Sequence, residues 1–159
     1  MERAVSNTTT LLFLAKVKRL DLLQNLYKKI YIPNKILEEI LIKETPELVY
    51  LKKYLGNYIL EENPKNLRSL PLDEGEQAAI SLCLEKKGNL FISDDLRARN
   101  FAESLGLPII GTLGILLDNL RRRKINKKEA FSLLQQLLTK GMYLSTDVYA
   151  EVEKIIEES

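Results

Sequence analysis

Residues 90–117, LFISDDLRARNFAESLGLPIIGTLGILL, carry the pattern that decides the fold class. Two short apolar runs, residues 90–93 and 108–111, are each followed at once by a stretch with helical periodicity. Short buried strands that alternate with helices indicate a parallel sheet that helices cover on both faces. The stretch therefore predicts an α/β fold.

The rest of the chain continues this alternation on both sides. We expect further strands at residues 3–7, 29–33 and 58–60. Expected helices occupy residues 11–15, 20–29, 33–43, 46–55, 73–87, 94–105 and 112–122. After them, two helices separated by Gly141 form a C-terminal extension, in which Ser145 or Thr146 caps the last helix. We predict a single domain over residues 1–159, with a core at about 3–120 and the extension at about 125–157.

The composition excludes several classes of active site. The chain of 159 residues is 45% hydrophobic and has 24 basic and 22 acidic side chains, so its net charge of +2 identifies no partner. Histidine is absent, which excludes Ser-His and Cys-His nucleophiles and zinc sites that use imidazole. Cys83 is the only cysteine and lies in an apolar stretch, so we expect a buried thiol.

The N-terminal apolar run, residues 8–17, is interrupted by Lys16 well short of the length of a membrane span. It also lacks the small-residue cleavage site of a signal peptide. The sequence therefore predicts a cytoplasmic protein without a membrane anchor.

Polar side chains fall at or near the ends of the expected strands. Asn7 ends the first strand, Glu39 lies in the helix after the second, and Glu76 opens the helix after the polar loop at residues 61–71. Each also has a local explanation, because Asn7 suits a helix cap, Glu39 a solvated helix face, and Asp73 with Glu76 a capping box. Parallel strands end at one edge of the sheet, where such side chains converge.

Asp94 and Asp95 end the strand at residues 90–93 and extend this acidic set. Their local explanation is an N-cap at Asp94 and a first-turn residue at Asp95. Converging carboxylates repel one another and need a cation, and oxygen ligands without histidine or thiolate select Mg²⁺ or Mn²⁺. Such an ion can polarise a phosphodiester, and Arg97 and Arg99 are placed to hold phosphate or to pair with the acids.

The densest basic segment is RRRK, which contains Arg121, Arg122 and Arg123. It is either a solvated helix end or a contact for the phosphates of a nucleic acid. The sequence leaves both interpretations open.

Four motifs in this order resemble the PIN-domain superfamily, and more closely its prokaryotic branch related to the VapC toxins. The resemblance runs from about Val5 to about Leu117, through VSNTT, IPNKILEEI, LDEGEQAAISLCLE and the stretch quoted first. It implies a three-layer α/β/α sandwich, a homodimer, and cleavage of RNA that depends on Mg²⁺ or Mn²⁺. It also implies the toxin of a toxin–antitoxin pair, held in check by an antitoxin protein.

The resemblance also assigns roles to residues of this sequence. The acidic positions of the family fall on Asn7, on Glu39 six residues after Pro33, on Glu76 and on Asp95. A small hydroxyl before the last acid falls on Ser93. The expected metal ligands are Asn7, Glu39, Glu76, Asp94 and Asp95. The expected catalytic residues are Glu39, Glu76 and Asp95. The expected RNA contacts are Arg97, Arg99, Arg121, Arg122 and Arg123.

Asn7 replaces the aspartate that active PIN nucleases usually carry, and a neutral amide binds a hard cation more weakly than a carboxylate. An alternative hypothesis is therefore a PIN-like binding module with weak or no catalysis. A second alternative, favoured by the fold class alone, is a receiver-like phosphoryl-transfer domain, but no convincing lysine stands at a strand end.

Overall fold

A five-stranded parallel sheet forms the centre of the computed structural model, which describes residues 3–86 and 89–159. Its strands are β1 (Ala4–Ser6), β2 (Ile30–Ile32), β3 (Ile59–Glu61), β4 (Leu90–Ile92) and β5 (Ile109–Ile110). They pair in the order β3-β2-β1-β4-β5, with Val5 level with Tyr31 on one side and Phe91 on the other. The expected α/β class is confirmed.

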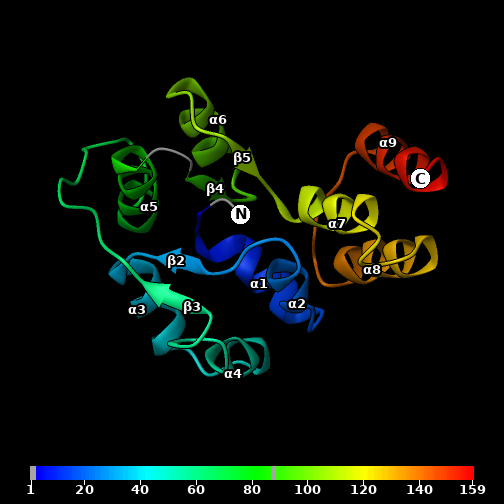
Figure 1. Cartoon of the computed structure of the whole chain (residues 1–159), viewed down its shortest axis with the longest axis horizontal. Coiled ribbons are helices and arrows are strands. Elements are labelled where there is room, and N and C mark those ends of the chain that lie inside the picture. Colours follow the sequence, from blue (N-terminus) through cyan, green and yellow to red (C-terminus); the bar gives the residue numbers. More distant parts are fainter. Residues whose placement is uncertain (1–2, 87–88) are drawn as a thin grey trace.

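Helices flank the sheet and continue beyond it. They are α1 (Thr8–Lys16), α2 (Asp21–Gln24), α3 (Asn34–Ile42), α4 (Pro46–Lys52), α5 (Glu74–Glu85), α6 (Leu96–Ser104), α7 (Thr112–Arg121), α8 (Lys127–Thr139) and α9 (Thr146–Glu157). Figure 1 shows α5 and α6 on one side of the sheet and α3 and α4 on the other. The direction of the strand order reverses at β1, which creates the crevice where α/β sheets place their sites.

Most helix boundaries differ from the expectation: α1 is longer, and α4, α6 and α7 are shorter. The helix expected at residues 20–29 is only the four-residue α2. Beyond its end, the Tyr27 carbonyl accepts a hydrogen bond from the hydroxyl of Tyr58, at 2.7 Å. Pro33 occupies the N-cap of α3 instead of its first turn. The helix expected at 73–87 begins one residue later and ends at Glu85, and residue 87 lies outside the described residues.

The hydrophobic core begins at the strands and extends into the C-terminal helices. Phe91 and Ile30 are fully buried, and Leu134 of α8 and Ile156 of α9 belong to the same buried cluster. Cys83 is 2% exposed, as expected, and burial raises the pKa of its thiol to about 12. Within residues 3–86 and 89–159, every helix is too short or too polar to cross a membrane.

Candidate functional site

The ends of β1 and β4 lie side by side at the reversal point and hold Asn7 in a fixed position. The backbone N–H of Asn7 donates to the carbonyl of Ile92 at 3.0 Å, and the residue is 2% exposed. Its Nδ2 donates to Ser93 Oγ at 2.6 Å, and its Oδ1 accepts from Thr9 Oγ1 at 2.9 Å. Asn7 occupies the N-cap position of α1, as the local explanation predicted, but its side chain accepts no hydrogen bond from the backbone of α1, all of which is described.

Asp95 is the residue that caps α6. Its Oδ2 accepts from the backbone N–H of Ala98 at 2.8 Å, and its own N–H donates to Ser93 Oγ at 3.1 Å. The expectation of a cap at Asp94 was therefore wrong by one residue. The carboxyl of Asp95 also lies near that of Glu76 from α5, close enough for its charge to raise the pKa of Glu76, so it serves the helix and faces another acid at once.

Glu39, Asp73 and Glu76 line one small pocket at this edge of the sheet. The pocket has a volume of about 130 Å³, and Asn7 also lines it. Glu39 projects from α3, and its Oε2 accepts a hydrogen bond from Thr8 Oγ1 at 2.6 Å. Asp73 caps α5 by accepting from the N–H of Glu76 at 2.8 Å, which confirms half of the predicted capping box.

Gly75 allows these acids to come close together. A Cβ atom at this position would lie 3.1 Å from Ile36 Cγ1 and 3.3 Å from Glu39 Oε1. Asp73 Oδ1 lies 3.6 Å from the same point. Carboxylates from α3 and from the start of α5 therefore approach one another over a residue without a side chain.

The environment of Glu76 favours its protonated form. Burial raises the pKa of Glu76 most, and the negative charges of Asp73 and Asp95 raise it further, to about 8. Near neutral pH the pocket therefore keeps a proton that an ordinary carboxyl would release.

The acidic pocket has no basic partner among residues 3–86 and 89–159. Among the described residues, Glu39, Asp73, Glu76 and Asp95 have no Lys or Arg nitrogen within 4.0 Å of their oxygens. Carboxylates that face each other without a basic partner have the donor chemistry of a hard divalent cation.

The acidic side chains are not arranged as a ready-made metal site. In the part of the chain that the structure describes, no three of the side chains of His, Cys, Asp and Glu are grouped closely enough to hold an ion. Glu39 is turned toward Thr8, and one oxygen of Asp95 is used by its helix cap. The oxygen donors suit Mg²⁺ or Mn²⁺, and to bind such an ion Glu39 must turn from Thr8 toward it.

Asp94 lies apart from the pocket, although it adjoins Asp95 in sequence. Its Oδ1 accepts from the backbone N–H of Thr112 at 3.0 Å, and its Oδ2 accepts from Thr10 Oγ1 at 2.7 Å and from Thr112 Oγ1. These contacts join β4 to the starts of α1 and α7. The structure thus gives Asp94 a structural role and leaves its predicted metal contact untested.

The five predicted RNA-contact arginines fall into two groups. Arg97 is exposed on α6, and Arg99 Nη1 donates to the Ser93 carbonyl at 3.1 Å, so both stand near the acidic edge. Arg121 ends α7 and pairs with Asp118 at 2.8 Å, and Arg122 and Arg123 follow it. At 1.5 Å per residue, the length of α7 separates this second group from the acidic edge by about 14 Å.

Sequence reasoning treated Asp73 as a helix cap alone and overlooked Thr8. Asp73 lies in the pocket because Gly75 brings the start of α5 against α3, and Thr8 holds Glu39. The GEQ sequence after Asp73 was the available signal, because glycine beside an acidic residue in the first turn of a helix suggests close approach.

Comparison with known proteins identifies the family of the chain. The sequence profile of the family DUF3368, described as a PIN domain, matches residues 3–158. The search of curated proteins gave no match.

Proposed function

The chain belongs to the PIN-domain family, and on this premise we propose that it is an endoribonuclease that depends on Mg²⁺ or Mn²⁺. One observation carries the proposal: Glu39, Asp73 and Glu76 line one pocket with Asp95 against Glu76, and no basic side chain among the described residues pairs with them. Such a pocket can hold a cation beside a phosphodiester.

The carboxylates of Glu39, Glu76 and Asp95 would hold the ion, and the side-chain amide oxygen of Asn7 would be a neutral ligand. When bound, the ion would polarise the scissile phosphodiester and stabilise the leaving oxygen. In the metal-free pocket Glu76 keeps a proton near neutral pH, because its pKa is raised to about 8, and it would release this proton on binding the ion, because a ligating carboxylate is deprotonated. Arg99, fixed on the Ser93 carbonyl, is placed to hold a phosphate next to the one that is cut.

The test is cleavage of defined single-stranded RNAs by the purified protein with Mg²⁺, with Mn²⁺ and with EDTA. Asp95→Asn should reduce the rate at least about 100-fold, since it removes a charge from the ion's ligands. Asparagine caps a helix as well as aspartate, so this variant should remain folded. Glu103→Gln, an exposed change on the same helix, is the matched control. Cleavage in EDTA, or equal rates for Asp95→Asn and the control, would refute the proposal.

A second candidate function is an RNA-binding module with little or no turnover. The position of Asn7 favours it, because the amide contributes no negative charge and both of its ends already make hydrogen bonds. Wild-type protein that binds RNA without cutting it, and gains metal-dependent cleavage on Asn7→Asp, would identify this function.

The role of toxin in a VapC-type pair, with an antitoxin partner, is the finer part of the proposal and rests on the sequence resemblance. A toxin should arrest growth when the wild type is expressed, and Asp95→Asn should not. If cells that express an active wild-type nuclease grow normally, the toxin role is refuted and the proposed nuclease activity still stands.

We also propose the expected homodimer, which an exposed apolar patch supports. Leu41, Ile42 and Val49 on α3 and α4 are 53%, 78% and 50% exposed. Light scattering should give twice the chain mass for the wild type and a smaller mass for Ile42→Glu. A monomeric wild type would exclude the homodimer.

A further inference from the structure

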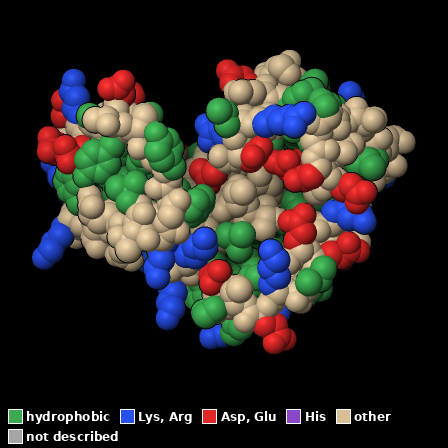
Figure 2. Space-filling view, turned by 180° about the vertical axis from the view of Figure 1, so that it is seen from behind, with side chains coloured by type: hydrophobic (Ala, Val, Ile, Leu, Met, Phe, Trp, Pro, Cys, Tyr) green, Lys and Arg blue, Asp and Glu red, His purple; other side chains and the backbone are tan. Residues whose placement is uncertain are grey.

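Two grooves meet on the face beside the acidic pocket. The first, of about 760 Å³, lies between α1, the starts of α6 and α7, and the connection from α8 to α9. The second, of about 610 Å³, lies between the end of α1, the start of α4 and the end of α8. Gly141 lines both, so the two grooves adjoin at the turn after α8, and we treat them together as one depression. Figure 2 shows this side of the molecule hollowed between the C-terminal helices and the larger body, which carries a group of acidic side chains.

The depression begins at the acidic edge of the sheet. Asp94 and Arg99 line its first groove, and the N–H of Asp94 donates at 3.2 Å to the hydroxyl of Thr9, which lines the acidic pocket. From Thr9 to Lys16 the depression follows α1 for about 10 Å.

Cationic side chains line the depression. Arg99 stands in the first groove, and Lys16, Lys18 and Lys140 line the second. None of the four forms an ion pair with a described carboxylate within 4.0 Å. Glu47 is the acidic residue that lines the second groove, so positive charge dominates this part of the surface.

Aromatic side chains line the first groove together with Arg99. Tyr143, on the connection from α8 to α9, is 87% exposed, which leaves its ring free for a ligand. Phe13 lines the first groove, and the ammonium of Lys16 lies 5.6 Å from its ring centroid. Rings beside unpaired cations along a groove are the features that bind single-stranded nucleic acid, since bases stack on the rings and phosphates meet the cations.

We propose that this depression, which we call the basic–aromatic track, holds a single-stranded segment of the RNA on one side of the bond that the acidic pocket cuts. The proposal rests on the proposed function for its substrate. Tyr143 and Phe13 stack unpaired bases, and Lys16, Lys18 and Lys140 contact the phosphates that follow. A duplex keeps its bases paired and unavailable for stacking, so the track selects single strands.

Binding of uncut RNA tests the track without requiring catalysis. We would measure the dissociation constant of a fluorescein-labelled, mixed-sequence RNA of 12 nucleotides by fluorescence anisotropy in EDTA, over a range of salt concentrations. Tyr143→Ala should weaken binding at least about fivefold, and Tyr143→Phe should bind like the wild type, because phenylalanine keeps the ring. The same RNA annealed to its complement should bind more weakly than the single strand.

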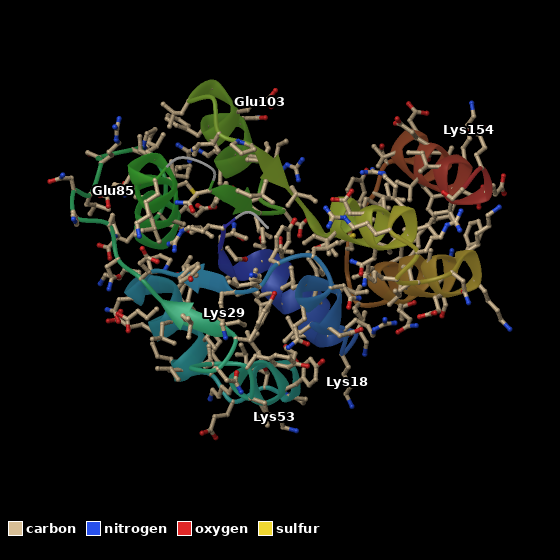
Figure 3. All side chains as sticks on the ribbon, in the orientation of Figure 1. Lys18, Lys29, Lys53, Glu85, Glu103 and Lys154 are labelled. Atoms are coloured by element: carbon tan, nitrogen blue, oxygen red, sulfur yellow. The ribbon has the colours of Figure 1, made fainter. Side chains whose placement is uncertain are left out.

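The lysines are tested together as Lys16→Gln, Lys18→Gln and Lys140→Gln. For a single strand, the loss of three phosphate contacts should lower the slope of log K against log salt by about 2. The matched control replaces Lys28, Lys65 and Lys154 by glutamine, removing the same charge from positions that line neither groove. Figure 3 shows Lys154 at the outer side of the C-terminal helices, away from Lys18. The control should keep the wild-type slope.

Each contrary outcome overturns the track. An equal loss of affinity in the control triple would show that only total charge matters, and equal binding of duplex RNA would exclude selection of single strands. RNA binding unchanged in both track variants would point to a protein as the occupant. Cleavage is read separately: RNA that binds through the track and is never cut refutes the nuclease, and cleavage with unchanged binding refutes the track alone.

Discussion

Replacing Glu76 by glutamine should remove a pH dependence of stability that the acidic pocket creates in the metal-free protein. Burial, with the charges of Asp73 and Asp95, raises the pKa of Glu76 from 4.5 to about 8. Between these two values the folded chain keeps a proton that the unfolded chain releases. The contribution to stability is therefore complete below about pH 4.5 and is lost as the pH rises through 8.

The magnitude follows from the separation of the two pKa values. At 1.36 kcal/mol for each pKa unit, the shift from 4.5 to about 8 corresponds to at most about 5 kcal/mol. Glu76 is only half-buried, and solvent screens the repulsion from its neighbours, so we expect about 1–2 kcal/mol. Glutamine resembles the protonated carboxyl in shape and carries no charge at any pH, so the variant lacks this pH-dependent contribution to the free energy of unfolding.

Urea unfolding in EDTA at pH 5 and at pH 8.5 measures the effect. The free energy of unfolding of the wild type should fall between these values by about 1–2 kcal/mol more than that of Glu76→Gln. Glu103→Gln, on the outer side of α6, is the control and should follow the wild type (Figure 3). Equal pH dependence in the wild type and Glu76→Gln would show that Asp73 and Asp95 do not crowd this carboxyl.

Three further changes separate the metal, structural and RNA-binding roles. Asn7→Asp should tighten Mn²⁺ binding, measured by calorimetry, because it adds a negative charge to the ligands. It should also lower the stability of the metal-free protein, because a carboxylate replaces a buried amide between Ser93 and Thr9. An unchanged binding isotherm would show that Asn7 is not a metal ligand. Asp94→Ala should lower the free energy of unfolding by about 3 kcal/mol in urea, because three hydrogen bonds to its carboxylate are lost; a change below 1 kcal/mol would contradict its structural role. Replacing Arg121, Arg122 and Arg123 together by alanine should leave the cleavage rate of a short RNA unchanged. It should weaken the binding of a long RNA and flatten the salt dependence of that binding. An equal loss of cleavage of the short RNA and of binding of the long RNA would place this segment at the acidic pocket.

The sequence predicted the fold class and most elements because they depend on local periodicity. Leu90, Phe91 and Ile92 form an unbroken apolar run, and such a short run between turn signals is typical of a strand buried on both faces. The turn that follows and the amphipathic helix α6 are equally local. The same reasoning placed Glu39, Glu76 and Asp95 near the ends of parallel strands, which meet at one edge of a sheet in any such fold.

Only the tertiary structure decided what each polar side chain contacts. Asp94 and Asp95 are the same residue type in adjacent positions. Neighbouring side chains of an extended chain point to opposite sides, so Asp94 contacts Thr112 and Asp95 lies near Glu76. Asp73 joins the pocket because α5 packs against α3 at Gly75, a contact between segments about 40 residues apart that no local pattern encodes. The ends of β1 and β4 hold Asn7 and Ser93 within hydrogen-bonding distance because the two strands pair, and this long-range pairing sets the geometry of the site.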